Sequence, residues 1–270
     1  MSTDQYNATV VQKVLMTPGL MTLRVKPDEE SPEFKPGQYT VLGLSSSAHR
    51  LQESEPDPVA YDEEKMIKRA YSISSASIVK EYFEFYISIV RSGQLTPRLF
   101  ALEQGDRLLI GKKAVGMFTL DNVPVEKNLL FISTGTGLAP YMSMLRSELH
   151  LHPGRTFAVL HGASCSWDLG YRDELSMMDR LTPTFHYVPT ITEPDKDPTW
   201  NGHSEFIEPI LSSGKLEEQV GMPLTPENFD VFLCGNPKMV EGVASMLESN
   251  GFKEHSKKEP GEIHVERFWK

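Results

Sequence analysis

Residues 128–149 read NLLFISTGTGLAPYMSMLRSEL, and this stretch decides the fold. An apolar run over 128–133 enters a glycine turn, and an apolar segment with helical spacing continues to about Leu149. A buried strand, a tight turn and a helix are therefore expected in that order. The turn is similar to the Gly-x-Gly-x-x-Gly fingerprint of dinucleotide sites, although Pro140 stands in place of the third glycine. A plain tight turn is the alternative, and the strand–turn–helix context favours a nucleotide contact.

The alternation of strand and helix continues to the end of the chain. Such alternation is typical of a doubly wound α/β domain with a parallel sheet. The expected strands cover 156–161, 185–191 and 229–233, and the expected helices cover 171–180, 204–212 and 237–249.

The first 120 residues have a different rhythm, with short apolar or alternating runs separated by turn residues. This spacing predicts an antiparallel barrel or sandwich. The boundary between the two domains falls near residues 121–126, which gives domains of 1–124 and 125–270. The expected strands of the first domain cover 8–12, 21–25, 38–44, 82–90 and 107–110.

One segment, residues 45–68, fits neither pattern. It is polar, rich in Ser, Glu and Asp, and contains two prolines. A long loop inside a compact domain is usually either functional or disordered. The composition favours a solvated, mobile excursion.

Composition excludes several classes of protein. The chain has 270 residues, 27 Lys and Arg against 37 Asp and Glu, a net charge of −10 and two cysteines. The acidic balance argues against nucleic-acid binding. Two cysteines cannot supply the four ligands of a standard iron–sulfur cluster, and no metal site is expected. No apolar run is long enough to cross a bilayer, and the polar first residues have no signal-peptide core, so a cytoplasmic protein without membrane insertion is expected.

Four further motifs carry chemistry. Residues 69–73, RAYSI, form a strand in which Arg69 can bind a phosphate and Tyr71 can stack on a planar ring. Residues 93–99, GQLTPRL, predict a turn and a short helix capped at Thr96, whose free N–H groups suit an anion. Residues 234–237, CGNP, follow a strand, and a buried structural cysteine is the plain interpretation. The last residues, HVERFWK, end in two aromatic side chains that either pack or cover a ring.

In their order along the chain, these four motifs and the glycine turn after residue 133 resemble the ferredoxin–NADP reductase family, particularly the bacterial flavodoxin/ferredoxin reductases. The resemblance covers the chain except residues 45–68. It implies a β-barrel FAD domain over 1–124, and an NAD(P)-binding α/β domain over 125–270 with a C-terminal tail that returns to the flavin. It also implies an enzyme that exchanges a hydride with NADP(H), or with NAD(H), and single electrons with a ferredoxin or flavodoxin. A monomer is expected.

The resemblance also assigns roles to residues. Catalytic roles fall to Ser72, Cys234, Glu266 and Phe268, and Phe268 would cover the flavin as a gate. FAD contacts fall to Arg69, Ala70, Tyr71, Ser72, Tyr86, Ile87, Ser88, Gly93, Gln94, Leu95, Thr96, Thr136, Phe268 and Trp269. Contacts with the nicotinamide dinucleotide fall to Gly135, Thr136, Gly137, Pro140, Ser164, Arg172, Cys234 and Gly235. The extra Lys270 departs from the pattern.

A second departure concerns the 2′-phosphate of NADP. The family has Ser-Arg-Glu after the third strand of this domain and Gly-Arg shortly beyond, where this chain has Thr192-Glu193 and Gly202-His203. Only Ser164, Arg172 and His203 remain as substitutes, and a neutral His suits a phosphate less well than Arg. The chain therefore leans only weakly toward NADP.

Two other functions stay open at the level of sequence. One is a free flavin reductase or diaphorase, in which the flavin is a substrate. The other is a non-enzymatic nucleotide-sensing module, because a fold alone does not fix a function. For the electron carrier, a basic rim near the flavin edge is one hypothesis, and scattered solvated side chains are the other. The rim would consist of Lys65, Lys68, Arg91, Arg98, Lys112 and Lys113.

Overall fold

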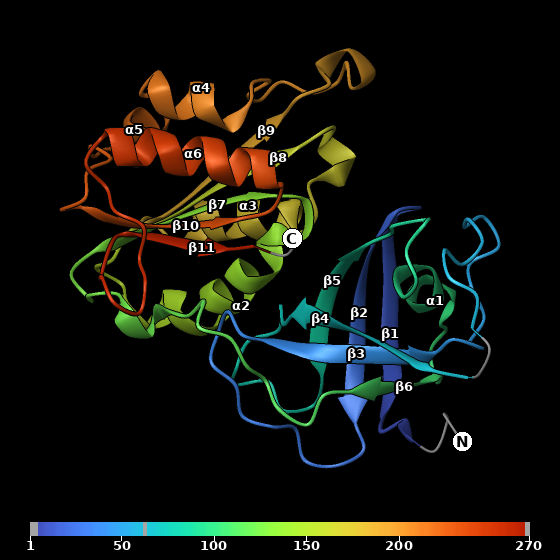
Figure 1. Ribbon diagram of the computed structural model, residues 1–270. Helices are drawn as coiled ribbons and strands as arrows, with labels where there is room; N and C mark the ends of the chain where they lie inside the picture. Colours follow the sequence, from blue (N-terminus) through green and yellow to red (C-terminus); the bar gives the residue numbers. More distant parts are fainter. Residues whose placement is uncertain (1–4, 62–63, 268–270) are drawn as a thin grey trace. The chain divides into compact units, whose positions relative to one another are not determined.

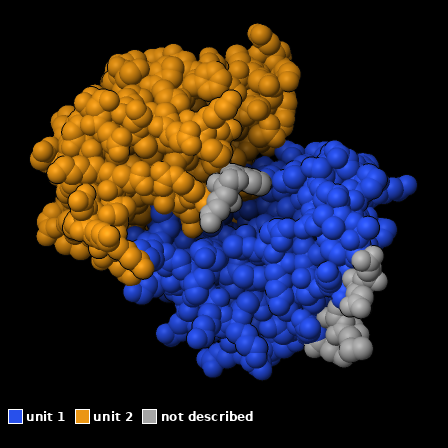
Figure 2. Space-filling model, viewed as in Figure 1, with its two compact units in different colours: residues 1–119, 139–147 blue, residues 120–138, 148–270 orange. Residues whose placement is uncertain are grey.

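The computed structural model describes residues 5–61 and 64–267. The chain divides into two compact units (Figure 2). Unit 1 consists of residues 1–119 and 139–147, and unit 2 of residues 120–138 and 148–270. The helix after the glycine turn therefore groups with unit 1, although the sequence places it beyond the expected boundary. The assignment of 1–124 and 125–270 to two binding functions stays a prediction.

Unit 1 is built on an antiparallel sheet with the strand order β4-β3-β6-β1-β2-β5 (Figure 1). The sheet curls until its two edge strands meet, because Ile73 and Phe85 form an antiparallel bridge and Ser74 N donates to Glu84 O at 2.8 Å. Closure of this kind removes exposed strand edges, as the predicted barrel requires. The strands are β1 (Ala8–Thr17), β2 (Leu20–Pro27), β3 (Tyr39–Ser45), β4 (Met66–Ser72), β5 (Phe83–Ser88) and β6 (Arg107–Ile110).

The core of unit 1 lies inside this curled sheet. Leu23, Leu42 and Phe85 are fully buried there, and helix α1 (Thr96–Ala101) adds Leu99. Complete burial of one such side chain contributes about 1.5–3 kcal/mol. The alternation of buried and exposed residues that predicted strands therefore also fixes which face of each strand points inward.

Helix α2 (Ala139–Glu148) is bound to the sheet of unit 1 by polar contacts. Ser143 Oγ donates to Ser75 O at 2.8 Å, and Arg146 Nη1 donates to Glu84 Oε1 at 2.7 Å. The Glu84 side chain is 4% exposed and also pairs with Arg24. Buried charges need such partners, so this ion-pair group holds the helix in a single position on unit 1.

Unit 2 is a parallel five-stranded sheet with the order β11-β10-β7-β8-β9. Its strands are β7 (Asn128–Thr134), β8 (Phe157–Ala163), β9 (Phe185–Ile191), β10 (Phe229–Cys234) and β11 (Ile263–Glu266). The order reverses between β7 and β10, which confirms the predicted doubly wound domain. Ligands of such domains bind in the crevice outside the carboxyl ends of the strands at this switch point.

Helices α4 (Ile207–Ser212), α5 (Lys215–Val220) and α6 (Pro237–Ser249) cover one face of this sheet (Figure 1). Helix α3 (Arg172–Leu181) contacts β9. Helix α5 was not predicted, because it has only six residues between Gly214 and Gly221, both at positive φ. Among the described residues, no helix has both the length and the apolar character that a membrane span needs.

The segment over residues 45–68 is solvated but is not a detached excursion. Leu51 N donates to Pro97 O at 2.9 Å, and Glu55 N donates to Arg91 O at 3.2 Å. Arg50 and Asp57 form an ion pair of 2.7 Å. These contacts join the segment to α1 and to the loop before it, and the expected mobility of the segment stays a prediction.

Candidate functional sites in the two units

In unit 1, the predicted phosphate ligand and the predicted phosphate turn lie together. Arg69 on β4 donates from Nη2 to the side-chain oxygen of Gln94 at 2.6 Å. Tyr71, on the same face of β4, has a ring that packs partly against the core. Burial raises the pKa of the Tyr71 hydroxyl, against the opposing effect of Arg69. The hydroxyl therefore stays protonated and can donate a hydrogen bond.

The turn over residues 93–96 differs in detail from its prediction. Thr96 is the first residue of α1 rather than its cap, and the cap position belongs to Leu95 without a side-chain hydrogen bond. The Thr96 hydroxyl instead accepts from Val90 N at 3.0 Å and donates to Val90 O at 3.1 Å. The predicted cap is wrong because Val90, in the loop after β5, offers the hydroxyl both a donor and an acceptor.

Two arginines hold the carbonyl groups of this turn. Arg50 Nη1 donates to Gly93 O at 3.0 Å, and Arg98 Nη1 donates to Gln94 O at 2.6 Å. In a planar trans peptide the N–H points opposite to the C=O. The N–H groups of Gln94 and Leu95 are therefore directed away from the arginines, as an anion site on this turn requires.

Asp57 joins the two arginines. Its carboxylate accepts from Arg50 at 2.7 Å and from Arg98 at 2.7 and 3.0 Å. The hydrogen bonds from Arg98 hold the pKa of Asp57 below its usual range, and the nearby Arg50 adds to this effect. We call Arg50, Asp57 and Arg98 the arginine clamp. The Arg98 side chain is only 1% exposed, so Arg98 cannot belong to an exposed basic rim.

The strand β5 contributes mainly backbone to any ligand. Tyr86 and Ile87 are 3% and 1% exposed, whereas Ser88 is exposed. The predicted contacts of Tyr86 and Ile87 with FAD are therefore limited to their main chains or the edge of the tyrosine ring. Ser72 is buried at the end of β4, and Ala70 is exposed.

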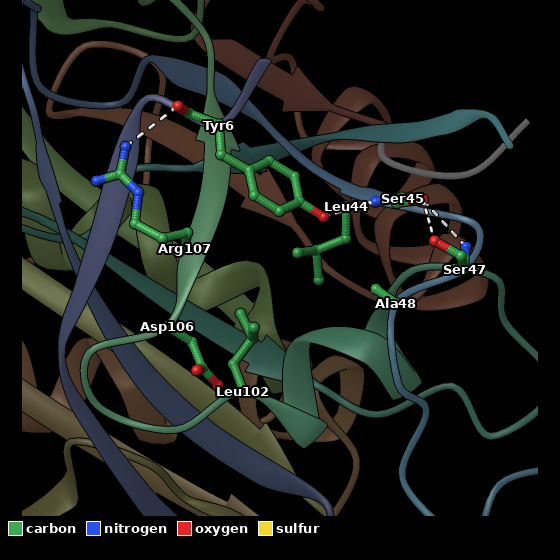
Figure 3. A pocket seen from close by; sticks show the side chains of 8 residues that line it. All are labelled: Tyr6, Leu44, Ser45, Ser47, Ala48, Leu102, Asp106 and Arg107. Carbon is green, nitrogen blue, oxygen red and sulfur yellow. Dashed lines mark hydrogen bonds between the residues drawn. The ribbon is translucent and has the colours of Figure 1, made fainter. Parts of the chain in front are cut away.

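A cavity of about 440 Å³ lies elsewhere in unit 1 (Figure 3). Leu44, Ala48 and Leu102 give it an apolar part, and Tyr6 and Arg107 border it. The Arg107 guanidinium is already paired with Asp28. None of the predicted site residues lines this cavity, so it is separate from the phosphate turn.

In unit 2, two turns meet at the switch point of the sheet. A Cβ at Gly137, in the short helix η3 (Gly135–Leu138), would overlap the carbonyl oxygen of Cys234, and one at Gly235 would overlap the Thr134 hydroxyl. Asn236 N donates to that hydroxyl at 2.8 Å. The turns after β7 and β10 therefore fit together only because glycines let their backbones touch. Gly135, at φ +53°, has open space where a Cβ would lie, Thr136 is half-buried at the same turn, and Pro140 follows in α2.

Cys234 lies next to Glu266 across the parallel pair β10–β11. The two residues are in register, and the Cys234 thiol donates to Glu266 Oε2 at 3.9 Å. Burial, and then the Glu266 carboxylate, raise the pKa of the thiol well above its usual range. Cys234 is therefore a protonated donor and not a nucleophile.

The loops after β8 and β9 lie beside each other at the carboxyl edge of the sheet in unit 2. Glu193 N donates to Ser164 O at 2.9 Å, and the Arg172 guanidinium lies 4.8 Å from the centre of the Trp200 ring. The structure thus brings Ser164 beside Glu193, and it places Arg172 on Trp200. Three carboxylates, of Asp168, Glu193 and Asp197, gather here, and sequence reasoning noted only the second. Phe268, Trp269 and Lys270 lie outside the described residues.

Comparison with known proteins agrees with this geometry. A family model described as an oxidoreductase NAD-binding domain matches residues 131–245. The flavodoxin/ferredoxin–NADP reductase of Buchnera aphidicola subsp. Baizongia pistaciae is 31% identical over 237 residues, which are 87% of this chain and 88% of the relative. The protein of that name in Escherichia coli is 32% identical over 238 residues, with coverage of 87% and 88%.

A solved structure supports the same conclusion. The ferredoxin NADP+ reductase of Neisseria gonorrhoeae, with bound FAD and NADP, aligns with a TM-score of 0.82 and 27% identity over 98% of this chain and 99% of that one. Identity above 30% over most of both chains, together with the two-unit architecture, defines the relationship. The chain belongs to the flavodoxin/ferredoxin–NADP reductase family.

Proposed function

We propose that the protein is an FAD-dependent ferredoxin (or flavodoxin)–NADP(+) reductase, with NAD(H) as the alternative dinucleotide. The chemistry that bound FAD supplies is exchange of a hydride with the nicotinamide and of single electrons with a small redox protein. The observation that carries the proposal is the hydrogen bond between Arg69 and Gln94. It joins two motifs, separated in sequence, that the family uses for FAD.

The residues of unit 1 fit the group. Arg69 offers a guanidinium to a pyrophosphate, and the turn over residues 93–96 directs N–H groups away from the arginine clamp. Tyr71 offers a half-buried ring for stacking and a protonated hydroxyl. Ser72 follows directly on the strand and supplies a hydroxyl at its end.

The residues of unit 2 suit a nicotinamide dinucleotide. The touching turns at Gly137 and Gly235 leave backbone N–H groups at the carboxyl ends of β7 and β10, where such domains bind pyrophosphate. The Cys234 thiol remains protonated and holds the Glu266 carboxylate by a hydrogen bond. Glu266 is then the group at this edge that can hold or accept a proton during turnover.

The electron carrier, the compartment and the oligomeric state form part of the same proposal. The electron carrier is a ferredoxin or flavodoxin, as the names of the relatives suggest. Both cysteines are free thiols, which agrees with a reducing cytoplasm. The protein is proposed to act as a monomer.

The test is an absorbance spectrum of the purified protein, followed by addition of NADPH or NADH without oxygen. A yellow protein that is bleached by a dinucleotide supports the proposal. A colourless protein that takes up no FAD contradicts it. Flavin that binds weakly and turns over as a free substrate would instead indicate a flavin reductase.

Tyr71→Ala tests the stacking role within the same experiment. We expect FAD to dissociate at least about tenfold more readily, because an aromatic contact with a flat ring is worth about 0.5–1.5 kcal/mol beyond its buried area. The measurement is fluorescence of released FAD. Tyr82→Ala, a change at an aromatic side chain stacked on Arg24, is the control. Equal release from both variants would contradict a specific role for Tyr71.

A further inference from the structure

The loops after β8 and β9 lie side by side at the carboxyl edge of the sheet in unit 2. Ala163 and Ile191 are paired in register at the ends of the two strands. Beyond them, Thr192 N donates to Ala163 O at 3.0 Å and Glu193 N donates to Ser164 O at 2.9 Å. In doubly wound domains, the residues after the second strand meet the adenosine ribose of the dinucleotide. β8 is the second strand here, and the matched NAD-binding region includes both loops.

These loops are predominantly acidic. Residues 164–172 and 192–203 contain four carboxylates, Asp168, Glu193, Asp195 and Asp197, against two cations, Arg172 and Lys196. Three of the carboxylates converge on the buried Cys165: burial raises the pKa of its thiol, and Asp168, Glu193 and Asp197 raise it further. Lys196 opposes this effect on the thiol. Hydrogen bonds place the same carboxylate residues around residues 164–166: Asp197 accepts from Ser166 N at 2.8 Å, and Asp168 N donates to Cys165 O at 3.0 Å.

Both cations of these loops already have partners. Lys196 pairs with Glu193 at 2.5 Å, and Arg172 lies over the Trp200 ring near Asp197. Asp197 itself accepts from Ser166 N at 2.8 Å, and its hydrogen bonds to Ser166 hold its pKa below the usual range. A phosphate that bound Lys196 would have to displace the Glu193 carboxylate, and it would then lie beside negative charges.

The two dinucleotides differ only at the ribose 2′ position. NADP has a phosphate there, and a phosphate monoester carries about −1.5 to −2 charges at pH 7. NAD has a hydroxyl, which can donate a hydrogen bond to a carboxylate, as in NAD-specific sites of this fold. A phosphate that replaces this hydroxyl within about 4–6 Å of a carboxylate at the protein surface costs on the order of 1–3 kcal/mol in repulsion.

We propose that this acidic edge selects a dinucleotide with a free 2′-hydroxyl, so that the enzyme binds NAD(H) more tightly than NADP(H), with Glu193 as the specificity-determining residue. The proposal rests on the proposed function, because it concerns the dinucleotide site of that enzyme. It departs from the names of the relatives, which are NADP reductases.

The test is equilibrium titration of the FAD-loaded protein with NAD+ and NADP+, followed by difference absorbance of the flavin. A second arm titrates 5′-AMP and 2′,5′-ADP by calorimetry, which reports on the ribose edge without turnover. We expect NAD+ to bind about tenfold more tightly than NADP+, and 5′-AMP more tightly than 2′,5′-ADP. NADP+ binding that equals or exceeds that of NAD+ overturns the inference while leaving the proposed function intact. Absence of binding by both dinucleotides overturns the two together.

Two variants assign the effect to Glu193. Glu193→Gln releases Lys196 and should reduce the preference for NAD+ by about tenfold, and Glu193→Arg should reverse it. The control is Glu218→Gln on α5, an exposed site with the same change of charge. A ratio of affinities that is unchanged in both Glu193 variants, or equally changed in the control, overturns the role of Glu193.

Discussion

Each unit has a turn that is expected to bind a pyrophosphate, and the two turns are held in place in different ways. In unit 1, the carbonyl groups of residues 93–94 are bound by arginines, and a carboxylate from a distant loop fixes those arginines. In unit 2, Gly137 and Gly235 let the two turns touch, and the Thr134 hydroxyl joins them by accepting a hydrogen bond from Asn236 N. The first turn therefore depends on charge and the second on volume. We therefore expect a change of charge to impair the turn in unit 1, and an increase in side-chain volume to impair the turn in unit 2.

The largest effect is expected for Gly137→Ala. Its Cβ would overlap the carbonyl oxygen of Cys234, and backbone cannot yield as a side chain can. Overpacking of this kind costs about 1–3 kcal/mol, and the displaced turns should lose most of their affinity for a dinucleotide. Thermal unfolding and dinucleotide titration measure the two effects. Gly154→Ala is the matched control, because nothing lies within 4 Å of its added Cβ. Equal behaviour of the two variants would show that unit 2 does not depend on volume.

Asp57→Asn tests the arginine clamp. The amide cannot neutralise the buried Arg98, and removal of one partner from a fully buried pair costs about 3–5 kcal/mol. Because the Asp57 side chain is 22% exposed, solvent screening reduces the expected loss to about 1–3 kcal/mol. We expect roughly tenfold weaker FAD retention with unchanged affinity for dinucleotide in unit 2. Glu53→Gln, in a longer and exposed pair with Arg91, is the control. Retention of FAD at the level of the native protein would show that the clamp does not position the turn.

The pH dependence of stability also separates the units. His161 on β8 is fully buried, and burial lowers its pKa from 6.5 to about 3. A group with a lowered folded pKa binds more protons when unfolded, so this residue makes stability fall as the pH drops from about 6.5 toward 3. The slope approaches about 1.4 kcal/mol per pH unit in that window. The clamp is unaffected above pH 3.8, since the pKa of Asp57 is lowered from that value.

Denaturation at pH 7 and pH 5 measures this slope. His161→Gln removes the titrating group and should flatten the dependence, whereas His150→Gln, at an exposed site, should leave it unchanged. An identical pH dependence in native protein and His161→Gln would contradict the assignment. The groups that cause the pH dependence would then have to be sought among the carboxylates of unit 1.

The smallest effect is expected for Thr96→Val. The hydroxyl makes two hydrogen bonds with the backbone of Val90, and each is worth about 1 kcal/mol net. Thermal unfolding should show a loss of about 1–2 kcal/mol, with a modest decrease in FAD affinity. Thr199→Val, which removes a single side-chain hydrogen bond in unit 2, is the comparison. A larger decrease in FAD affinity than for Asp57→Asn would reverse the order of importance proposed for the clamp and the threonine.

Local patterns in the sequence were sufficient for the architecture. Short apolar or alternating runs predicted the strands of unit 1, and the alternation of strands and helices after about residue 126 predicted the doubly wound sheet. The proximity of Arg69 to the turn also followed, once the motifs were recognised together. Helix α5 was missed because six residues between two glycines have too little periodicity.

The arginine clamp could not be predicted in the same way. Arg98 reads as one more basic residue on a short helix, and its partner Asp57 lies 41 residues earlier in a segment without periodicity. The available signal was the position of Asp57 between Pro56 and Pro58, because the two prolines restrict the backbone within an otherwise polar loop. The acidic edge was missed for a similar reason, because the loops that carry Asp168 and Asp197 come together only when β8 and β9 pair.

The burial of Arg98 has a consequence for exchange of parts between related reductases. A relative with a short connection between β3 and β4 has no carboxylate to bring to this position. Transplanting the short connection into this chain would leave a permanently ionised guanidinium in the interior, and transplanting the long one elsewhere would expose Asp57 without its counter-ion. Residues 46–57 and Arg98 should therefore be exchanged or redesigned together.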